Sequence, residues 1–86
     1  MPELCRFYGI VIRMYFADHA PPHFHATYQG EEAIFAISGL AVLQGKLPAR
    51  AHGLVVEWAA LHQEELREAW LCRERHEATG TIDPLP

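Results

Sequence analysis

The chain has few cysteines and no long hydrophobic run. Its 86 residues include two cysteines, Cys5 and Cys72, which lie far apart and form no CxxC pair. A cytosolic chain keeps such thiols reduced, so we expect buried or idle thiols, with a single disulfide between the two as the alternative. No apolar run approaches the roughly 20 residues that a membrane-spanning helix needs. The sequence therefore predicts no contact with a membrane.

The N-terminal segment lacks the features of a secretory signal. MPELCRFYG has neither a basic start nor an apolar core, and we therefore expect a cytoplasmic protein. Half of the residues are hydrophobic and 21% are charged, which is an ordinary globular composition. This length suffices for one modest hydrophobic core. We expect a single domain over residues 1–86.

Clusters of basic residues are also missing. The net charge is −4; residues 1–50 carry four acids and four bases, whereas residues 51–86 carry seven acids and three bases. A protein that grips a phosphate backbone usually presents clustered Lys and Arg side chains. Nucleic-acid binding is therefore disfavoured, although a small local site with Arg6, Arg13 and Arg50 stays open. The sequence also holds no Ser-His-Asp arrangement, phosphate-binding glycine loop or paired-carboxylate motif.

The first half of the chain is patterned as β-strands. Residues 7–16 alternate, and the uniformly apolar set should face the core; this set is Tyr8, Ile10, Ile12, Met14 and Phe16. Residues 23–28, 31–37 and 41–47 predict three further strands, with turns at Gln29-Gly30 and Ser38-Gly39. The third strand should bury Ala33, Phe35 and Ile37.

The second half is patterned as one long helix. From Ala49 to about Ala78 apolar residues recur at helical spacing; they are Ala51, Leu54, Val55, Trp58, Leu61, Leu66 and Ala69. Pro48 suits the first turn and Gly80 suits the stop. The predicted fold is α+β: a small antiparallel β-meander of about four strands with one long C-terminal helix packed across one face. The apolar tail at residues 81–85 should dock on the domain.

The predicted helix is too long for the domain. About 29 residues would extend about 43 Å, whereas a compact domain of this size is roughly 30 Å across. Either the helix breaks near Gly53, or its C-terminal half projects past the sheet. A projecting half would present Trp70, Leu71 and Cys72 to a partner, either in a homo-oligomer or in a complex with another protein.

The stretch DHAPPHFHA, residues 18–26, holds half of the six histidines. His23 and His25 share one face of the predicted strand with Thr27, while Phe24, Ala26 and Tyr28 take the other. The apolar set should lie under the helix, so the two imidazoles should point away from the core and be exposed. An HxH pair on a strand suits a shared metal ion, and His19 could curl back as a third ligand of a divalent metal such as Zn²⁺, with Asp18 beside it.

Two other interpretations of these histidines stay open. His23 or His25 could act as a general acid or base without a metal, because imidazole titrates near neutrality. The histidines could also donate hydrogen bonds to backbone carbonyls and fix a turn whose proline residues cannot donate. HxH alone does not separate these roles.

The same segments resemble a known family. RFYGIVIRMYF (6–16), DHAPPHFHA (18–26), GKLP (45–48), the helical pattern that includes Trp58 and Trp70, and the closing IDPL (82–85) are similar to short prokaryotic proteins of the domain of unknown function 4160 family. No activity is assigned to the family. Similar proteins are often encoded beside a second small protein, so the resemblance implies a small neighbour-encoded protein partner and a toxin–antitoxin-like pair.

Two functions follow as hypotheses. The first is a small protein-interaction module, one half of a toxin–antitoxin-like pair, with Trp70, Leu71 and Cys72 in the interface. The second is a metal-dependent hydrolase, with a ribonuclease as one version, in which His19, His23 and His25 hold the ion and the ion lowers the pKa of its bound water. The acidic balance of the chain weakens the ribonuclease version, and we prefer the interaction module.

Overall fold

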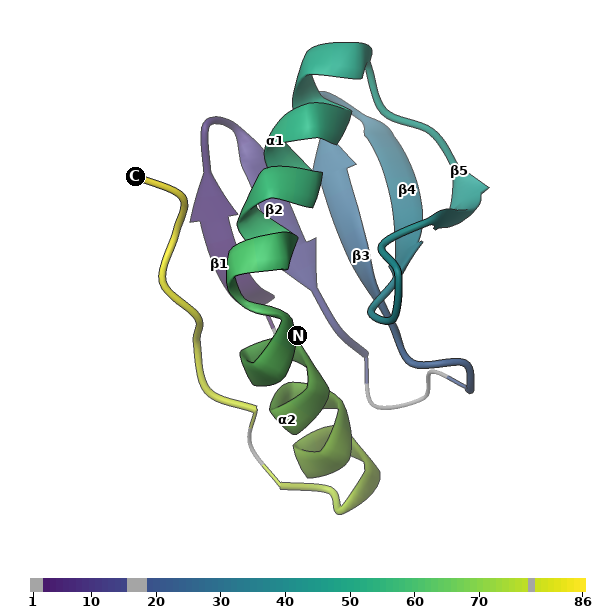
Figure 1. The fold of residues 1–86 in the computed structure, drawn as a ribbon, viewed down its shortest axis with the longest axis vertical. Coiled ribbons are helices and arrows are strands. Elements are labelled where there is room, and N and C mark those ends of the chain that lie inside the picture. Colours follow the sequence, from purple (N-terminus) through teal and green to yellow (C-terminus); the bar gives the residue numbers. More distant parts are fainter. Residues whose placement is uncertain (1–2, 16–18, 78) are drawn as a thin grey trace.

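The chain forms an antiparallel sheet followed by two helices. The computed structural model describes residues 3–15, 19–77 and 79–86. Over these residues the strands are β1 (Glu3–Phe7), β2 (Ile10–Arg13), β3 (His23–Tyr28), β4 (Glu31–Ala36) and β5 (Val42–Gly45). The helices are α1 (Ala49–Leu61) and α2 (Gln63–Glu74). The strands pair in chain order, each antiparallel to the next (Figure 1), which confirms the α+β class and the meander.

The single strand predicted over residues 7–16 is instead a hairpin, so the described residues form five strands and not four. β1 and β2 turn at Tyr8 and Gly9, whose φ values are +48° and +82°. Two successive residues at positive φ are typical of a tight hairpin turn that matches the twist of its strands. The predicted orientation is wrong at this turn, because Phe7 is buried and Tyr8 is 56% exposed.

Beyond the turn the predicted alternation holds. Ile10, Ile12 and Met14 are completely buried, and Phe16 lies outside the described residues. β3 has the predicted bounds, and the turn at Gln29-Gly30 again uses two positive φ values. Most inward side chains of β3 and β4 are completely buried, as expected for one face of a half-covered sheet; they are Phe24, Ala26, Ala33 and Phe35. Tyr28 at the end of β3 is partly buried, and Ile37, just after β4, is buried.

The single long helix is also a wrong prediction. The helical path breaks at His62, where φ is −120° and ψ is 24°, while Gly53 lies within α1. α2 ends at Glu74, before the predicted stop, and Ala78 lies outside the described residues. The break separates α1, which crosses the sheet, from α2, which lies below the sheet in the view of Figure 1. The whole molecule measures 34 × 26 × 23 Å.

The break also changes which side chains are buried. α1 crosses one face of the sheet (Figure 1) and buries Ala51, Val55 and Trp58, as the helical spacing predicts. Leu61, the last residue of α1, was predicted to be buried but is 66% exposed. The core extends onto α2, where Leu66, Ala69 and Trp70 are buried.

The C-terminal tail docks along β1, as expected. The Ile82 amide donates to the Leu4 carbonyl at 2.9 Å, and Ile82 and Leu85 are buried. The Trp58 indole Nε1 donates to the Asp83 carbonyl at 2.8 Å. The tail therefore fixes the free edge of β1 with both hydrogen bonds and apolar contacts.

Both cysteines are free thiols in the structure. Cys5 is buried in the core, and burial raises the pKa of its thiol. A buried thiol with a raised pKa is a poor nucleophile, in agreement with the prediction of idle thiols. Among the described residues, no helix combines the length and the hydrophobicity that crossing a membrane requires.

Candidate functional site

The two faces of the sheet differ in what covers them. α1 packs across one face of the sheet (Figure 1). We call the opposite face the outer face; α2 reaches it at His23, whose ring lies 5.3 Å from that of Trp70. The side chains on this face alternate with core residues along β2, β3 and β4. Six of them form what we call the outer-face cluster: Arg13, Tyr15, His23, His25, Thr27 and Glu32.

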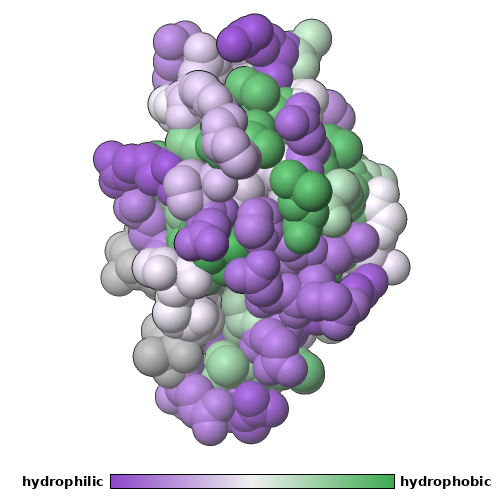
Figure 2. Space-filling model, turned by 60° about the vertical axis from the view of Figure 1, so that its left-hand side comes forward, coloured by the Kyte–Doolittle hydropathy of each residue, from purple (hydrophilic) through white to green (hydrophobic). Residues whose placement is uncertain are grey.

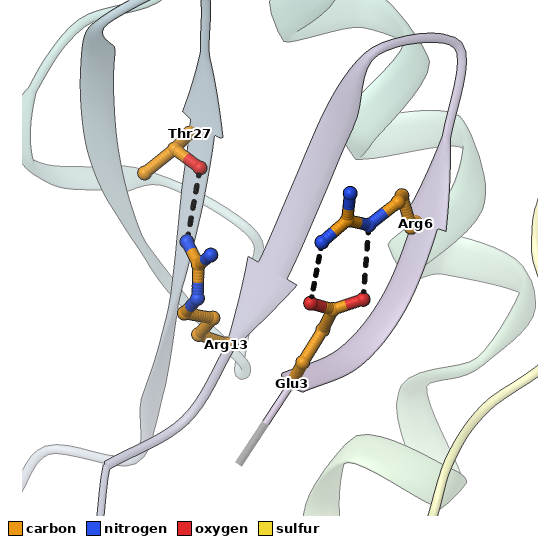
Figure 3. A network of polar contacts seen from close by, with 4 residues as sticks. All are labelled: Glu3, Arg6, Arg13 and Thr27. Carbon is orange, nitrogen blue, oxygen red and sulfur yellow. Dashed lines mark hydrogen bonds and ion pairs between the residues drawn. The ribbon is translucent and has the colours of Figure 1, made fainter. Parts of the chain in front are cut away.

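The centre of the outer-face cluster is a cross-strand pair. Arg13 on β2 lies directly opposite His25 on β3, and opposed residues of antiparallel strands have Cβ atoms about 4.5–5.5 Å apart. Arg13 Nη1 donates to Thr27 Oγ1 at 3.3 Å, as Figure 3 shows. Strand pairing therefore places a guanidinium, an imidazole and a hydroxyl side by side.

His25 is held on two further sides. Its Nδ1 donates to Glu32 Oε2 at 3.2 Å, and the ring of Tyr15 meets it edge to face with 4.6 Å between centroids. The His25 side chain is only 12% exposed, although no helix covers it, because its neighbours pack around it. The imidazole is therefore fixed in place, unlike a freely rotating surface side chain.

His23 is buried, which corrects the expectation that it is exposed. Its ring lies 5.3 Å from that of His25 and 5.3 Å from that of Trp70, which comes from α2. Its Nδ1 donates to the Pro21 carbonyl at 2.7 Å. For His23 this geometry agrees with the interpretation in which a histidine fixes the proline turn.

The metal site predicted from the three histidines stays untested. The structure brings His23 and His25 together, whereas His19 is exposed. Among the described residues, no group of three or more His, Cys, Asp and Glu side chains is arranged to hold a metal ion. Asp18, the other predicted contributor, lies outside the described residues.

A second arginine on the sheet is already paired with an acid. Arg6 contacts the Glu3 carboxylate through both Nε and Nη2, at 3.1 and 2.8 Å (Figure 3). This hydrogen-bonded pair, and to a lesser extent the charge of Arg13, lowers the pKa of the Glu3 carboxyl. A bidentate arginine–carboxylate pair occupies two of the guanidinium N–H donors and sets a negative charge against the positive one, so Arg6 is less suited than Arg13 to bind another anion.

The predicted interface residues divide between two sides of α2. Trp70 is buried, with the Arg73 guanidinium carbon 3.8 Å from its ring centroid, while Leu71 is 44% exposed. Both line an apolar groove of about 250 Å³, which we call the α2 groove; its lining is Pro22, Ile37, Ser38, Arg67, Trp70 and Leu71. Cys72 lines a separate hollow with Glu65 and Ile82.

The surface beside the tail has a different character. Figure 2 shows the molecule turned so that the β1 and tail side of Figure 1 comes forward. Hydrophilic residues dominate this face, and hydrophobic ones appear in small separate groups. Scattered single hydrophobic side chains are normal for a solvated surface, so the α2 groove is the better candidate for a protein contact.

The fold defines a small α+β domain in which α1 covers one face of an antiparallel meander and the other face carries a polar cluster that α2 borders at His23. The chain belongs to the family described as domain of unknown function (DUF4160), whose model matches residues 9–71. No curated protein and no solved structure gives a significant match. The matched range includes every residue of the outer-face cluster and of the α2 groove.

Sequence reasoning noticed the histidines of the site and, separately, Arg13 as part of an open local site with Arg6 and Arg50, but it did not bring Arg13 and the histidines together. Arg13 and Tyr15 alternate with the buried Ile12 and Met14, and this alternation was the signal that placed them on the outward face. Their meeting with His25 depends on the β2–β3 register, in which Arg13 pairs with His25. The spacing of residues within one strand does not give that register.

Proposed function

We propose that this protein is a protein-interaction module, one half of a toxin–antitoxin-like pair, and that its α2 groove receives a small neighbour-encoded protein. The observation that carries the proposal is Leu71, which is 44% exposed at the lip of an apolar groove formed by Trp70 and Ile37. A large aliphatic side chain beside an apolar groove is typical of a surface that a partner covers.

The size of the α2 groove favours a protein side chain over a small molecule. Its volume of about 250 Å³ lies below the range of roughly 300–1,000 Å³ that is usual for small-molecule sites. Protein interfaces commonly seat one aromatic or aliphatic anchor in such a depression and surround it with weaker contacts. We expect the partner to place one apolar anchor over Trp70, next to the guanidinium of Arg67.

The test compares two leucine substitutions. We expect Leu71→Asp to weaken binding of the co-expressed neighbour-encoded protein at least about tenfold, because it places a charge in an apolar interface. Leu61→Asp is the matched control, since Leu61 is 66% exposed but lies outside the groove. The dissociation constant is measured by isothermal titration, and the mass of each species by light scattering.

The outcomes separate the possible occupants. Equal binding by both variants would contradict the proposal. A homodimer that Leu71→Asp dissociates, without any binding of the neighbour-encoded protein, would assign the groove to a second copy of the chain. A chain that stays monomeric and does not bind the neighbour-encoded protein would contradict the proposal that this protein is an interaction module.

A further inference from the structure

We infer that the outer-face cluster binds the phosphate group of a small phosphorylated ligand, with Arg13 as the central contact. The site lies on the sheet face opposite α1 and shares no residue with the lining of the α2 groove. It is therefore a separate site, although His23 of the cluster packs against Trp70 of the groove with 5.3 Å between ring centroids.

Arg13 has the chemistry that a phosphate requires. A guanidinium presents five N–H donors in a planar fork that matches the oxygens of a phosphate. In the structure Arg13 Nη1 donates to the neutral hydroxyl of Thr27 at 3.3 Å. Arg6, by contrast, is held by both carboxylate oxygens of Glu3. Arg13 is therefore the arginine of this sheet whose hydrogen-bonded partner is a neutral side chain. The Glu3 carboxylate, which lies opposite Arg13 in the β1–β2 register, is bonded to Arg6.

The surrounding side chains hold this arrangement in advance of binding. Thr27 orients Arg13, and the carboxylate of Glu32 and the ring of Tyr15 fix the imidazole of His25. Arg13 and Tyr15 are both half-buried. Side chains that are already ordered lose less conformational entropy when a ligand binds, so a few contacts suffice for a small anion.

The charge distribution favours a small ligand over a nucleic acid. The chain carries a net charge of −4, all of it from the surplus of acids in residues 51–86. A long polyanion would be repelled by this surplus and would find no basic track to follow. A single phosphate needs only the local positive charge of Arg13 and the polar groups beside it.

The experiment follows the arginine Nε–H and histidine ring signals by NMR during titration. Inorganic phosphate, adenosine monophosphate and a short single-stranded DNA are the three probes, and sodium chloride controls for ionic strength. We expect saturable shifts at Arg13 and His25 with phosphate, and tighter binding of the mononucleotide. Arg13→Gln should weaken phosphate binding about tenfold, as expected when a charged, forked contact is lost.

Two matched variants make the result specific. Arg6→Gln should change the dissociation constant less than about twofold, because Arg6 is paired with Glu3. Thr27→Val keeps the shape of the side chain and removes the hydroxyl that orients Arg13, so it should weaken binding even if Arg13→Gln fails to fold. Leu71→Asp should bind phosphate like the parent chain, which keeps this proposal separate from the protein contact.

Several results would overturn the inference. Shifts that never saturate, that sodium chloride reproduces, or that Arg13→Gln and Thr27→Val leave unchanged would show that there is no site. DNA that binds more tightly than the mononucleotide would overturn the assignment to a small ligand.

Discussion

Trp58 joins three parts of the molecule that are distant in sequence. It is completely buried, and its ring lies 5.5 Å from that of Phe7 on β1 and 6.0 Å from that of Phe24 on β3. Its indole nitrogen donates to the Asp83 carbonyl of the tail at 2.8 Å. One side chain therefore connects α1, the sheet and the C-terminal segment.

We expect Trp58→Phe to lower the free energy of unfolding by about 2–3 kcal/mol, because it loses both buried volume and the hydrogen bond to Asp83. Urea denaturation measures the change. Tyr8→Phe is the control: it also removes a hydrogen bond to the tail, from Tyr8 Oη to the Pro86 carbonyl at 2.6 Å, but at an exposed position.

The control variant should cost under about 1 kcal/mol, which is the usual net contribution of one hydrogen bond. Equal losses in the two variants would contradict the central position of Trp58. They would show that the contribution of Trp58 to the free energy of unfolding comes from its hydrogen bond to the tail and not from the packing of its indole ring.

Individual side chains were predicted well where their contacts are local. The alternation of polar and apolar residues placed Ile12, Phe24 and Phe35 in the core. It failed for His23, since the ring that buries it belongs to Trp70 on α2, 47 residues later in the sequence. Periodicity describes which face a residue occupies, but not which distant element covers that face.

Two glycines illustrate how the elements are joined. Gly45 ends β5 at a φ of +75°, and a Cβ atom there would collide with the backbone carbonyl of Glu32 on the neighbouring strand. Gly53 lies inside α1, and a Cβ atom there would meet no atom within 4 Å. The first position therefore requires glycine for its conformation and for its close approach to β4, while the second does not.

We expect Gly45→Ala to destabilise the protein by about 2 kcal/mol or more, because it adds both backbone strain and a steric clash. Gly53→Ala should stabilise it by roughly 0.5–1 kcal/mol, since alanine is the better residue within a helix. Thermal and urea unfolding of the two variants measure these changes. A tolerated Gly45→Ala, or a destabilising Gly53→Ala, would contradict the placement of β5 or α1.

The boundaries of the elements were harder to predict than their types. The helical spacing of apolar residues continues through His62, so the pattern itself contains no sign of a break. The break is held by contacts outside that pattern: His62 Nδ1 donates to Glu65 at 2.6 Å, and Gln63 donates to the Ile37 carbonyl at 2.8 Å. The hairpin turn at Tyr8 was missed for a related reason, because a tyrosine at positive φ is uncommon.

At the scale of the whole molecule, one sheet separates two environments. The inner face and the helices bury the apolar side chains, while the outer face carries charged and hydrogen-bonding groups. The HxH spacing at residues 23–25 was enough to place both imidazoles on the outer face. The rest of the candidate site depends on pairing between strands and on the direction of α2, which brings Trp70 and Leu71 to the α2 groove.

This separation is the central claim of our account, and two alanine substitutions on adjacent residues of β3 test it most directly. Phe24→Ala should lower the free energy of unfolding by about 3–5 kcal/mol, because Phe24 is fully buried and its removal leaves a cavity. His25→Ala should cost no more than about 1.5 kcal/mol, because it loses polar contacts of the outer face, among them the hydrogen bond to Glu32, and leaves the apolar core intact. Comparable losses, or a larger loss for His25→Ala, would contradict the assignment of the two faces.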